Sequence, residues 1–333
     1  MKRKQLSACA ALILIAGASP PEQGDVGPLV RALWLVQRHG TADAADPRND
    51  LRTKGSLFKA MGKDGVLTPT GVNGLMDPST FSKLAGPDER LDPAEVSRAL
   101  EADIPDSRRR LAPKVAAHAA LLSTSFDMID GPHREAGETL AGWIAENHRP
   151  GQPLHVTVIC TGNSRQSILG ATMGNVAAAY YGFPEVRFHS GGTAPTAFNP
   201  RTSSALRDIG IEVEPTGDEA PRGEPATANP SYRVRWGQAG SADLETIEFS
   251  KVYGDKSNPQ DGFAALMVCG EADADAECPF VKGASLRVSM PYLDPKIYDG
   301  GDYESLKYAE RRDDLGRLML SVMMQVRQRQ PAR

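Results

Sequence analysis

The sequence predicts an α/β protein in which a mainly helical N-terminal region precedes a mostly parallel sheet with helices on both of its faces. From residue 154 onward, short apolar runs alternate with stretches that carry apolar residues at helical spacing. Residues 93–147 show helical spacing of three and four instead. With 333 residues, of which 40% are hydrophobic, the chain is long enough for one large domain or two ordinary ones.

Residues 1–18 have the layout of a secretory signal peptide. A basic start, MKRKQ, is followed by the apolar run LSACAALILIAGA, which ends in the small residues Ala16, Gly17 and Ala18. The run is shorter than the roughly 20 apolar residues that span a bilayer. Cys9 precedes most of the run, which disfavours a lipoprotein. We therefore expect an exported protein, periplasmic or secreted, that is not transmembrane.

Residues 19–150 form the expected helical region, whose role the sequence does not define. One motif in it, LWLVQRHGT followed by LTPTG, is similar to the start of histidine phosphatases and would make His39 a phosphoryl acceptor. A three-residue match is weak, and His118, His133 and His148 offer no evident second catalytic histidine. An ordinary loop histidine is the preferred interpretation of His39.

Residues 151–333 form the expected α/β domain. Its four apolar strand candidates are 154–160, 186–190, 263–269 and 286–290, and its helices are expected at 167–181, 199–210 and 302–328. Two further runs, SYRVRWG and LETIEFSKVY, are separated by GQAGSAD and predict an inserted hairpin near residues 230–252.

The stretch VICTGNSRQS carries the main functional signal. A strand that ends at Cys160 and turns directly into a helix gathers backbone N–H groups and a helix N-terminus around one concavity, which favours bound anions and a thiolate. Gly162 and Asn163 suit a turn that visits left-handed backbone conformations. Ser167, in the first helical turn, can hydrogen-bond the sulfur.

This stretch, CTGNSRQS, resembles the C-x5-R-S loop of the low-molecular-weight protein tyrosine phosphatases and of the thioredoxin-coupled arsenate reductases that share their fold. The resemblance covers residues 154 to about 328, because FHSGGTAPTAFNPRTSSAL, LMVCGEADADAECPF and MPYLDPK resemble further motifs in the family's order. It implies that Cys160 is the nucleophile and Asp294 the general acid, with Cys269 and Cys278 as a redox pair. The implied oxyanion-binding loop consists of Thr161, Gly162, Asn163, Ser164, Arg165 and Gln166.

Gln166 departs from the family pattern, since it stands where the loop's arginine is expected and Arg165 lies one position earlier. A neighbouring loop position faces a different way, so we do not expect Arg165 to replace the bidentate fork on two oxygens. Arg165 could instead favour the Cys160 thiolate from beneath. Losing one well-placed charge-stabilising donor costs about 100- to 1,000-fold in rate, whereas an amide still offers hydrogen bonds worth roughly 1 kcal/mol each.

The expected activity is therefore phosphate monoester hydrolysis through a cysteinyl-phosphate intermediate, on a phosphorylated small molecule or phosphoprotein. Two alternatives stay open: arsenate reduction by Cys160, Cys269 and Cys278 with an external thiol reductant, and a weakened protein that only binds an oxyanion or a phosphorylated ligand. Cys269 and Cys278 could equally form a structural disulfide, and all three cysteines could be buried apolar residues.

Partners of other classes are not expected. The cysteine spacing matches no zinc site, and the proposed chemistry needs no metal or organic cofactor. The net charge of −4 and pI near 5.9 give no basic footprint for nucleic acid. The sequence leaves the oligomeric state open.

Overall fold

The computed structural model describes residues 66–70, 78–92, 94–96, 104–222, 227–269 and 280–330. The signal-peptide segment, His39 and Cys278 lie outside the described residues. Within the described ranges, no helix combines the length and the apolar character that crossing a membrane requires.

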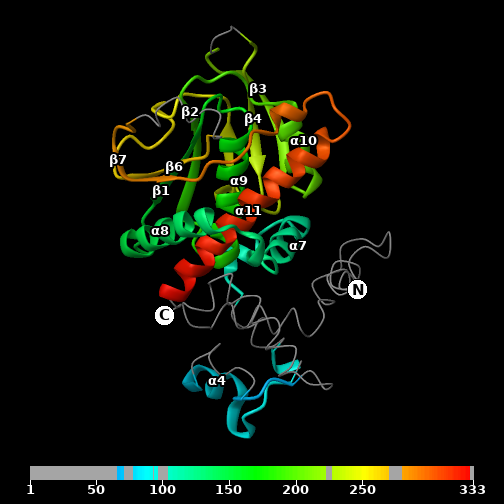
Figure 1. The fold of residues 1–333 in the computed structure, drawn as a ribbon, viewed down its shortest axis with the longest axis vertical. Helices are drawn as coiled ribbons and strands as arrows, with labels where there is room; N and C mark the ends of the chain where they lie inside the picture. The colour runs from blue at the N-terminus through cyan, green and yellow to red at the C-terminus, as the bar shows by residue number, and fades with distance from the viewer. Residues whose placement is uncertain are drawn as a thin grey trace.

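A four-stranded parallel sheet forms the centre of the molecule (Figure 1). Its strands stand in the order β2-β1-β6-β7. Their bounds are Leu154–Cys160 for β1, Val186–Gly192 for β2, Phe263–Met267 for β6 and Ala284–Ser289 for β7. The sheet confirms the predicted α/β class, with helices flanking parallel strands.

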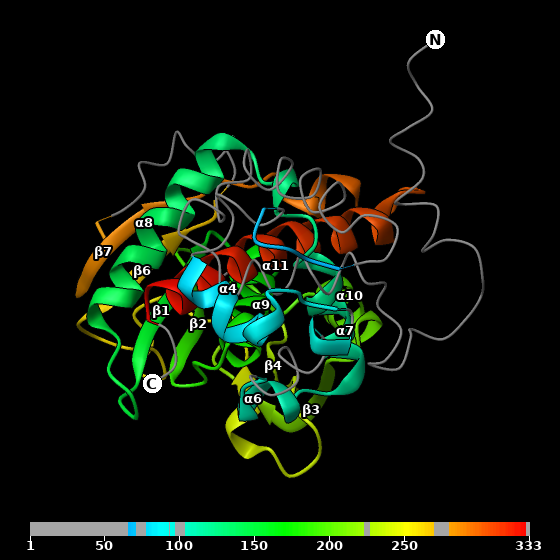
Figure 2. The same ribbon diagram turned by 90° about the horizontal axis from the view of Figure 1, so that it is seen from below.

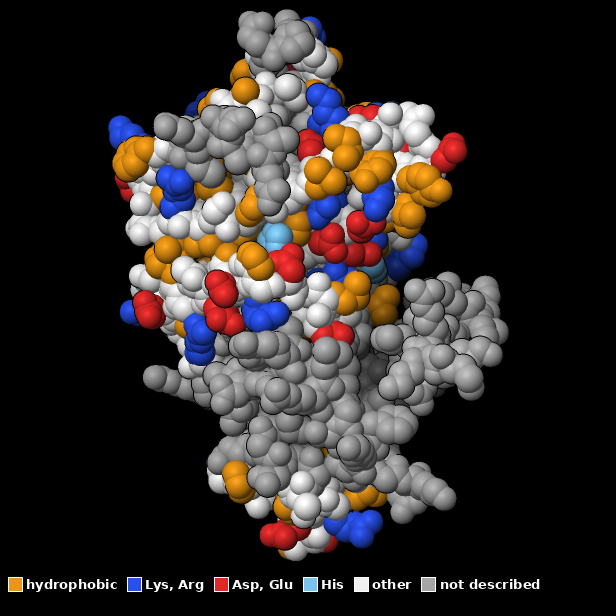
Figure 3. Space-filling view, viewed as in Figure 1, with side chains coloured by type: hydrophobic (Ala, Val, Ile, Leu, Met, Phe, Trp, Pro, Cys, Tyr) orange, Lys and Arg blue, Asp and Glu red, His pale blue; other side chains and the backbone are white. Residues whose placement is uncertain are grey.

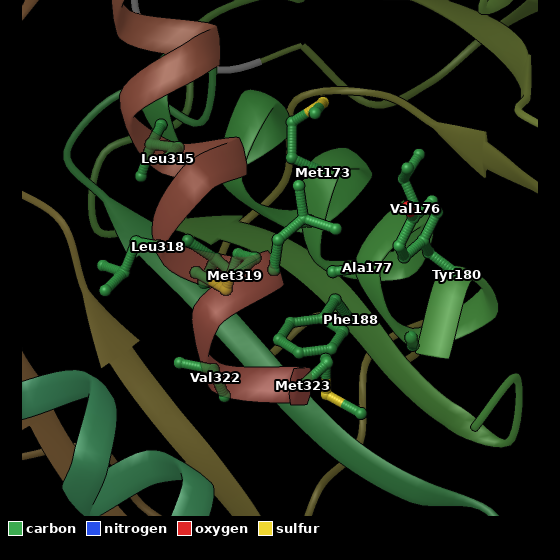
Figure 4. Close-up of a cluster of buried hydrophobic side chains, with 14 of the residues drawn as sticks. Met173, Val176, Ala177, Tyr180, Phe188, Leu315, Leu318, Met319, Val322 and Met323 are labelled. Atoms are coloured by element: carbon green, nitrogen blue, oxygen red, sulfur yellow. The ribbon is translucent and has the colours of Figure 1, made fainter. Parts of the chain in front are cut away.

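Two long helices make the largest contact within the domain. They are α9, Gln166–Tyr181, and α11, Glu304–Arg329, which pack against each other while α9 also packs on β1 and β2. Every residue of α9 is buried, because the sheet, α11 and the N-terminal helices surround it. Figure 4 shows the apolar side chains that fill this contact, which are Met173, Val176, Ala177, Tyr180, Phe188, Leu315, Leu318, Met319, Val322 and Met323.

The other face of the sheet has its own small core. Side chains alternate along a strand, so Ile159 points away from the side that Val158 and Cys160 face. Ile159 packs in a buried cluster whose other members are Phe263, Ala265, Met267 and Val281. The residues that end β1 and β6 are thus buried on both faces, which gives a rigid base for the loops at the carboxyl ends of these strands.

Three helices of the N-terminal region are built onto the same core. They are α6, Asp106–Arg109, α7, Pro113–Leu122, and α8, Gly131–Asn147, with the short 3-10 helix η3, Phe126–Met128, between α7 and α8. Figures 1 and 2 both show α7 and α8 beside α11. The buried apolar residues of α7, η3 and α8 belong to one continuous cluster with the sheet and with α9. Helices α7 and α8, which precede residue 150, therefore share a hydrophobic cluster with the sheet that follows it.

A second, antiparallel sheet has the order β3-β4-β5, with β3 at Glu212–Glu219, β4 at Pro230–Arg235 and β5 at Glu245–Glu248. Strands β4 and β5 lie in the region where the sequence predicts a hairpin. Strand β3 was not predicted, because EVEPTGDE contains Pro215 and Gly217 and buries only Val213. Helix α10, Pro200–Asp208, precedes β3 and contacts it.

A smaller described part lies earlier in the chain. Helix α4, Pro78–Ala85, is followed by the 3-10 helix η2, Gly86–Asp88, and Leu67 pairs with Leu91 in an isolated antiparallel bridge. Phe81 is buried in this part together with Leu67 and Leu91.

Candidate functional site

The loop after β1 turns its carbonyl groups toward the segment that follows β2. The carbonyls of Thr161 and Gly162 accept hydrogen bonds from the amides of Ala194 and Thr196, at 2.9 and 3.0 Å. With the carbonyls fixed on that side, the intervening amides face the other way. Within the described ranges, the amides of Gly162, Asn163 and Ser164 donate to no hydrogen-bond partner. Such a row of inward-facing amides at the start of a long helix is a binding place for an anion.

Asn163 supplies the left-handed turn that the loop needs, with a φ of 40°. It is fully buried, and its side-chain orientation is determined by its partners. The amide of Lys251 donates to Oδ1 of Asn163 at 2.8 Å, so the Nδ2 group must be the donor toward Oγ of Ser167, also at 2.8 Å. Gly162, which we also expected to adopt a left-handed conformation, does not, so Asn163 alone makes this turn.

The hydroxyl of Ser167 links Asn163 to the sulfur of Cys160. Its Oγ lies 3.1 Å from Sγ of Cys160. The hydroxyl accepts the Asn163 donor and keeps one hydrogen of its own, and an ionised sulfur has no hydrogen, so toward a Cys160 thiolate the hydroxyl is the donor. Cys160 and Ser167 are both buried, and a hydroxyl donor stabilises a thiolate more than a thiol. The sequence predicted the contact between Ser167 and Cys160, but not the part played by Asn163.

Ser250, in the segment after β5, and Asn229 form a clamp that holds the loop through hydrogen bonds. Oγ of Ser250 donates to the carbonyl of Gly162 at 2.9 Å and accepts from the amide of Thr196 at 2.9 Å. The buried side chain of Asn229 in turn bonds the backbone of Ser250 in both directions, at 2.8 and 3.1 Å. The sequence analysis missed Asn229, Ser250 and Lys251, since no local pattern shows that they meet a loop almost 90 residues earlier.

Gly192, at the end of β2, leaves no room between strand and loop. A Cβ atom placed on it would lie 2.6 Å from the carbonyl oxygen of Thr161 and 2.8 Å from the amide nitrogen of Asn163. Only glycine allows the loop to come this close. The expected family motif contained this glycine, but only the structure shows what touches it.

Buried charged groups lie next to the clamp. Glu248 and Lys251 form an ion pair at 3.2 Å, and Oγ of Ser190 also donates to Glu248, at 2.7 Å. Burial, and then the neighbouring His155, Lys251 and Arg187, lower the pKa of His189 to about 3. The ring of His189 is therefore neutral at pH 7 and lies 3.0 Å from His155.

Gln166 does not reach into the loop with its side chain. It is buried, and its Nε2 donates to the backbone carbonyl of Tyr292. The position where the family arginine is expected therefore serves as an anchor for residues 290–294 instead of offering the side-chain donor that the sequence analysis allowed for.

Arg165 contacts residues of the C-terminal segment. Its Nε donates to the hydroxyl of Tyr308 at 2.7 Å, and its guanidinium lies 3.5 Å from Asp299 and 3.9 Å from Asp294. Burial, and then the hydrogen bond to Asp299, raise the pKa of Tyr308 to about 12. The charge of Arg165 is thus shared with carboxylates of the C-terminal segment. The expected position beneath Cys160 is not supported by these contacts.

Asp294 caps the short 3-10 helix η6, Pro295–Tyr298, by accepting the amide of Lys296 at 2.9 Å. Its side chain is 35% exposed, so part of the carboxylate region is open to solvent. The neighbouring surface carries exposed apolar residues, and Figure 3 shows hydrophobic side chains gathered there beside charged ones. They are Leu293, Ile297, Tyr303 and Leu306.

Cys269 follows β6, the neighbour of β1, and is half-buried. Its Sγ lies 3.9 Å from the carbonyl oxygen of Ile159, the residue before Cys160. The structure therefore brings Cys269 to the same sheet edge as Cys160. Among the described residues, no group of three or more His, Cys, Asp or Glu side chains is arranged to hold a metal ion.

No protein-family model and no curated protein sequence matches this chain. Among solved structures, it is similar to a thioredoxin-dependent arsenate reductase from Corynebacterium glutamicum. The match has 16% sequence identity, covers 69% of this chain and 87% of that chain, and has a TM-score of 0.29. An overlap this low carries no argument about function, so the function is argued from the residues of this chain.

Proposed function

We propose that this protein hydrolyses phosphate monoesters, with Cys160 as the nucleophile. The observation that carries the proposal is the series of hydrogen bonds from Lys251 through Asn163 to Ser167, whose hydroxyl lies 3.1 Å from Sγ of Cys160 and can donate to its thiolate. A buried cysteine with only a packing role needs no oriented donor. A nucleophilic thiolate under a row of unpaired amides does.

The proposed reaction has two steps. The Cys160 thiolate attacks phosphorus in line, the S–P bond forms and the P–O bond to the leaving group breaks, while a protonated Asp294 gives its proton to the departing oxygen. Water then attacks phosphorus, the S–P bond breaks, and the ionised Asp294 takes the proton from the water. Free phosphate and the original thiolate result.

Binding of the phosphoryl oxygens rests on the backbone in this proposal. The amides of the loop and the N-terminus of α9 would hold the equatorial oxygens, because Gln166 is engaged with Tyr292 and Arg165 with Tyr308 and Asp299. Without a bidentate guanidinium, we expect turnover about 100- to 1,000-fold below that of a loop that has one. The exposed apolar residues beside Asp294 favour a substrate with an aryl or other apolar leaving group.

The test is hydrolysis of a small aryl phosphate by the native protein, with Cys160→Ser as the blank. We expect slow turnover that disappears in Cys160→Ser and falls in Asp294→Asn. The variant Ser167→Ala should lower the rate of Cys160 alkylation by iodoacetamide at neutral pH, since it removes the donor to the sulfur. Turnover that persists in Cys160→Ser would exclude the proposal.

Arsenate reduction is the second candidate, and the position of Cys269 favours it. In that reaction, Cys160 would attack arsenate with loss of water, and the Cys269 thiolate would then attack Sγ of Cys160, so that the As–S electron pair leaves with arsenite. Cys278 would displace Cys160 to form the Cys269–Cys278 disulfide, and an external dithiol would reduce that bond. Arsenate-dependent consumption of a dithiol, absent in Cys269→Ala, would establish this activity.

A third possibility is oxyanion binding without turnover, which the engaged side chain of Gln166 favours. Phosphate binding by calorimetry, unchanged in Asp294→Asn and without turnover in either protein, would support it.

We also propose that the chain is exported after removal of residues 1–18. The N-terminal sequence of the protein recovered from the producing cells tests this directly.

A further inference from the structure

Three successive backbone carbonyls before Asp294 are each held by a side chain from a different element. Nε2 of His133, from α8, lies 3.0 Å from the carbonyl oxygen of Pro291. Gln166, from the start of α9, donates to the carbonyl of Tyr292, and Nε of Arg311, from α11, donates to that of Leu293 at 3.0 Å. The position of Asp294 is therefore set by three anchors outside its own segment.

The His133 anchor differs from the other two because it depends on a proton. The other ring nitrogen, Nδ1, lies 2.7 Å from the carboxylate of Asp130. A carboxylate and a backbone carbonyl can only accept hydrogen bonds, so both contacts form together only when both ring nitrogens carry hydrogen. The neutral ring can keep one contact, and its remaining lone pair then faces an oxygen atom.

The surroundings support a cationic ring. Asp130 is the N-cap of α8, and the backbone and side-chain hydrogen bonds from His133 lower its pKa against the opposing effect of burial, so it is ionised at neutral pH. The ring of His133 stacks on Tyr292 at 4.2 Å between centroids. The other charged groups on this side are cations and one acid, namely Arg134 on α8 and Arg311, Asp314 and Arg317 on α11.

The positive and negative charges on α11 near His133 largely cancel. Arg311 and Arg317 are each paired with Asp314 at 3.1 Å, so the nearby guanidinium groups are partly neutralised. Burial raises the pKa of Asp314, whereas the two arginines lower it. The direct partners of His133 are thus two oxygen acceptors and an aromatic ring, each of which favours the protonated imidazole.

We propose that His133 is a positioning residue for Asp294: its protonated ring fastens the Pro291–Asp294 segment to helix α8, and deprotonation releases that contact. The N-terminal region would thereby influence the position of the candidate acid through the protonation state of one histidine. The part of the proposal that concerns Asp294 as an acid rests on the proposed function. The part that concerns the contact itself does not.

Two readouts separate these parts. The first is hydrogen exchange of the amides of Ile297 and Asp299, which bond within the turn that Asp294 begins, measured between pH 5.5 and 8.5 and corrected for intrinsic exchange. The second is the pH profile of aryl phosphate turnover. The variants are His133→Gln, which retains a neutral donor toward Pro291, and Asp130→Asn, which retains an N-cap acceptor but removes the charge. His118→Gln is the matched control, because His118 also joins the N-terminal region to α11, through Asp313 at 2.7 Å.

In the native protein and in His118→Gln, we expect protection to fall about tenfold as the ring loses its proton, which is the size of one net hydrogen bond. His133→Gln should make protection independent of pH, and Asp130→Asn should move the midpoint to lower pH. A native pH profile of exchange in His133→Gln would overturn the proposal. If exchange behaves as expected but no variant turns over substrate, the contact stands and the proposed function fails.

Discussion

Substituting alanine for Gly192 should displace the Cys160 loop and little else. The added Cβ would lie 2.6 Å from the carbonyl oxygen of Thr161, against about 3.4 Å for ordinary contact, so loop and strand must separate by up to 0.8 Å. The backbone conformation of Gly192 is not left-handed, so the substitution adds a steric effect without a conformational one. Overpacking of this kind costs about 1–3 kcal/mol of the free energy of unfolding.

The functional effect should be larger than the effect on stability. Residue Asn163, whose amide would lie 2.8 Å from the new Cβ, also orients Ser167 toward the sulfur. A displacement near 1 Å in a catalytic arrangement typically costs about 100-fold in rate. We therefore expect Gly192→Ala to lower both aryl phosphate turnover and Cys160 alkylation strongly while the protein stays folded.

Gly162→Ala is the matched control, since it adds the same methyl group to the same loop. Its Cβ would meet Oγ1 of Thr196 at 3.4 Å and Cβ of Ser164 at 3.7 Å, which are ordinary contacts. We expect a change in the free energy of unfolding within about 0.5 kcal/mol. Denaturant unfolding and iodoacetamide kinetics on both variants provide the comparison. Equal values for Gly192→Ala and Gly162→Ala would refute the steric argument.

Three further outcomes are expected. Because the pKa of His189 is lowered on folding, its ring takes up a proton below pH 6.5 in the unfolded chain but stays neutral in the folded protein. The free energy of unfolding should therefore fall by about 2 kcal/mol between pH 7 and 5. An equal loss of stability in His189→Gln over this pH range would contradict this. Asn163→Ala should unfold more easily than Asn163→Gly, by about 1 kcal/mol, because alanine disfavours the left-handed conformation; denaturation midpoints compare them. Cys269→Ala should abolish dithiol consumption with arsenate while leaving aryl phosphate turnover intact, and parallel loss of both would exclude separate roles for Cys160 and Cys269.

Gln166 shows which features of a side chain neighbouring residues in the sequence can predict and which they cannot. The departure from the expected arginine is visible in the sequence, which has no guanidinium to offer at that position. Where the amide would point is not visible, because its partner, the carbonyl of Tyr292, lies 126 positions later and becomes a neighbour only through packing against α11. The same holds for Arg165, whose partners Tyr308 and Asp299 are on the C-terminal segment.

The sequence by itself determined the parallel strands and long helices of the α/β domain and the local surroundings of Cys160, because both depend on residues close together in the chain. Apolar periodicity defined β1, α9 and the long α11, and a cysteine between a strand and a helix with Ser167 seven positions on defined the local donor. Only the tertiary structure decided what holds that local unit in place. Ser250 and Lys251 bond the loop from the segment after β5, Asn229 holds Ser250, and His133 holds the segment before Asp294. Contacts between distant segments leave no periodic signal in the residues that make them.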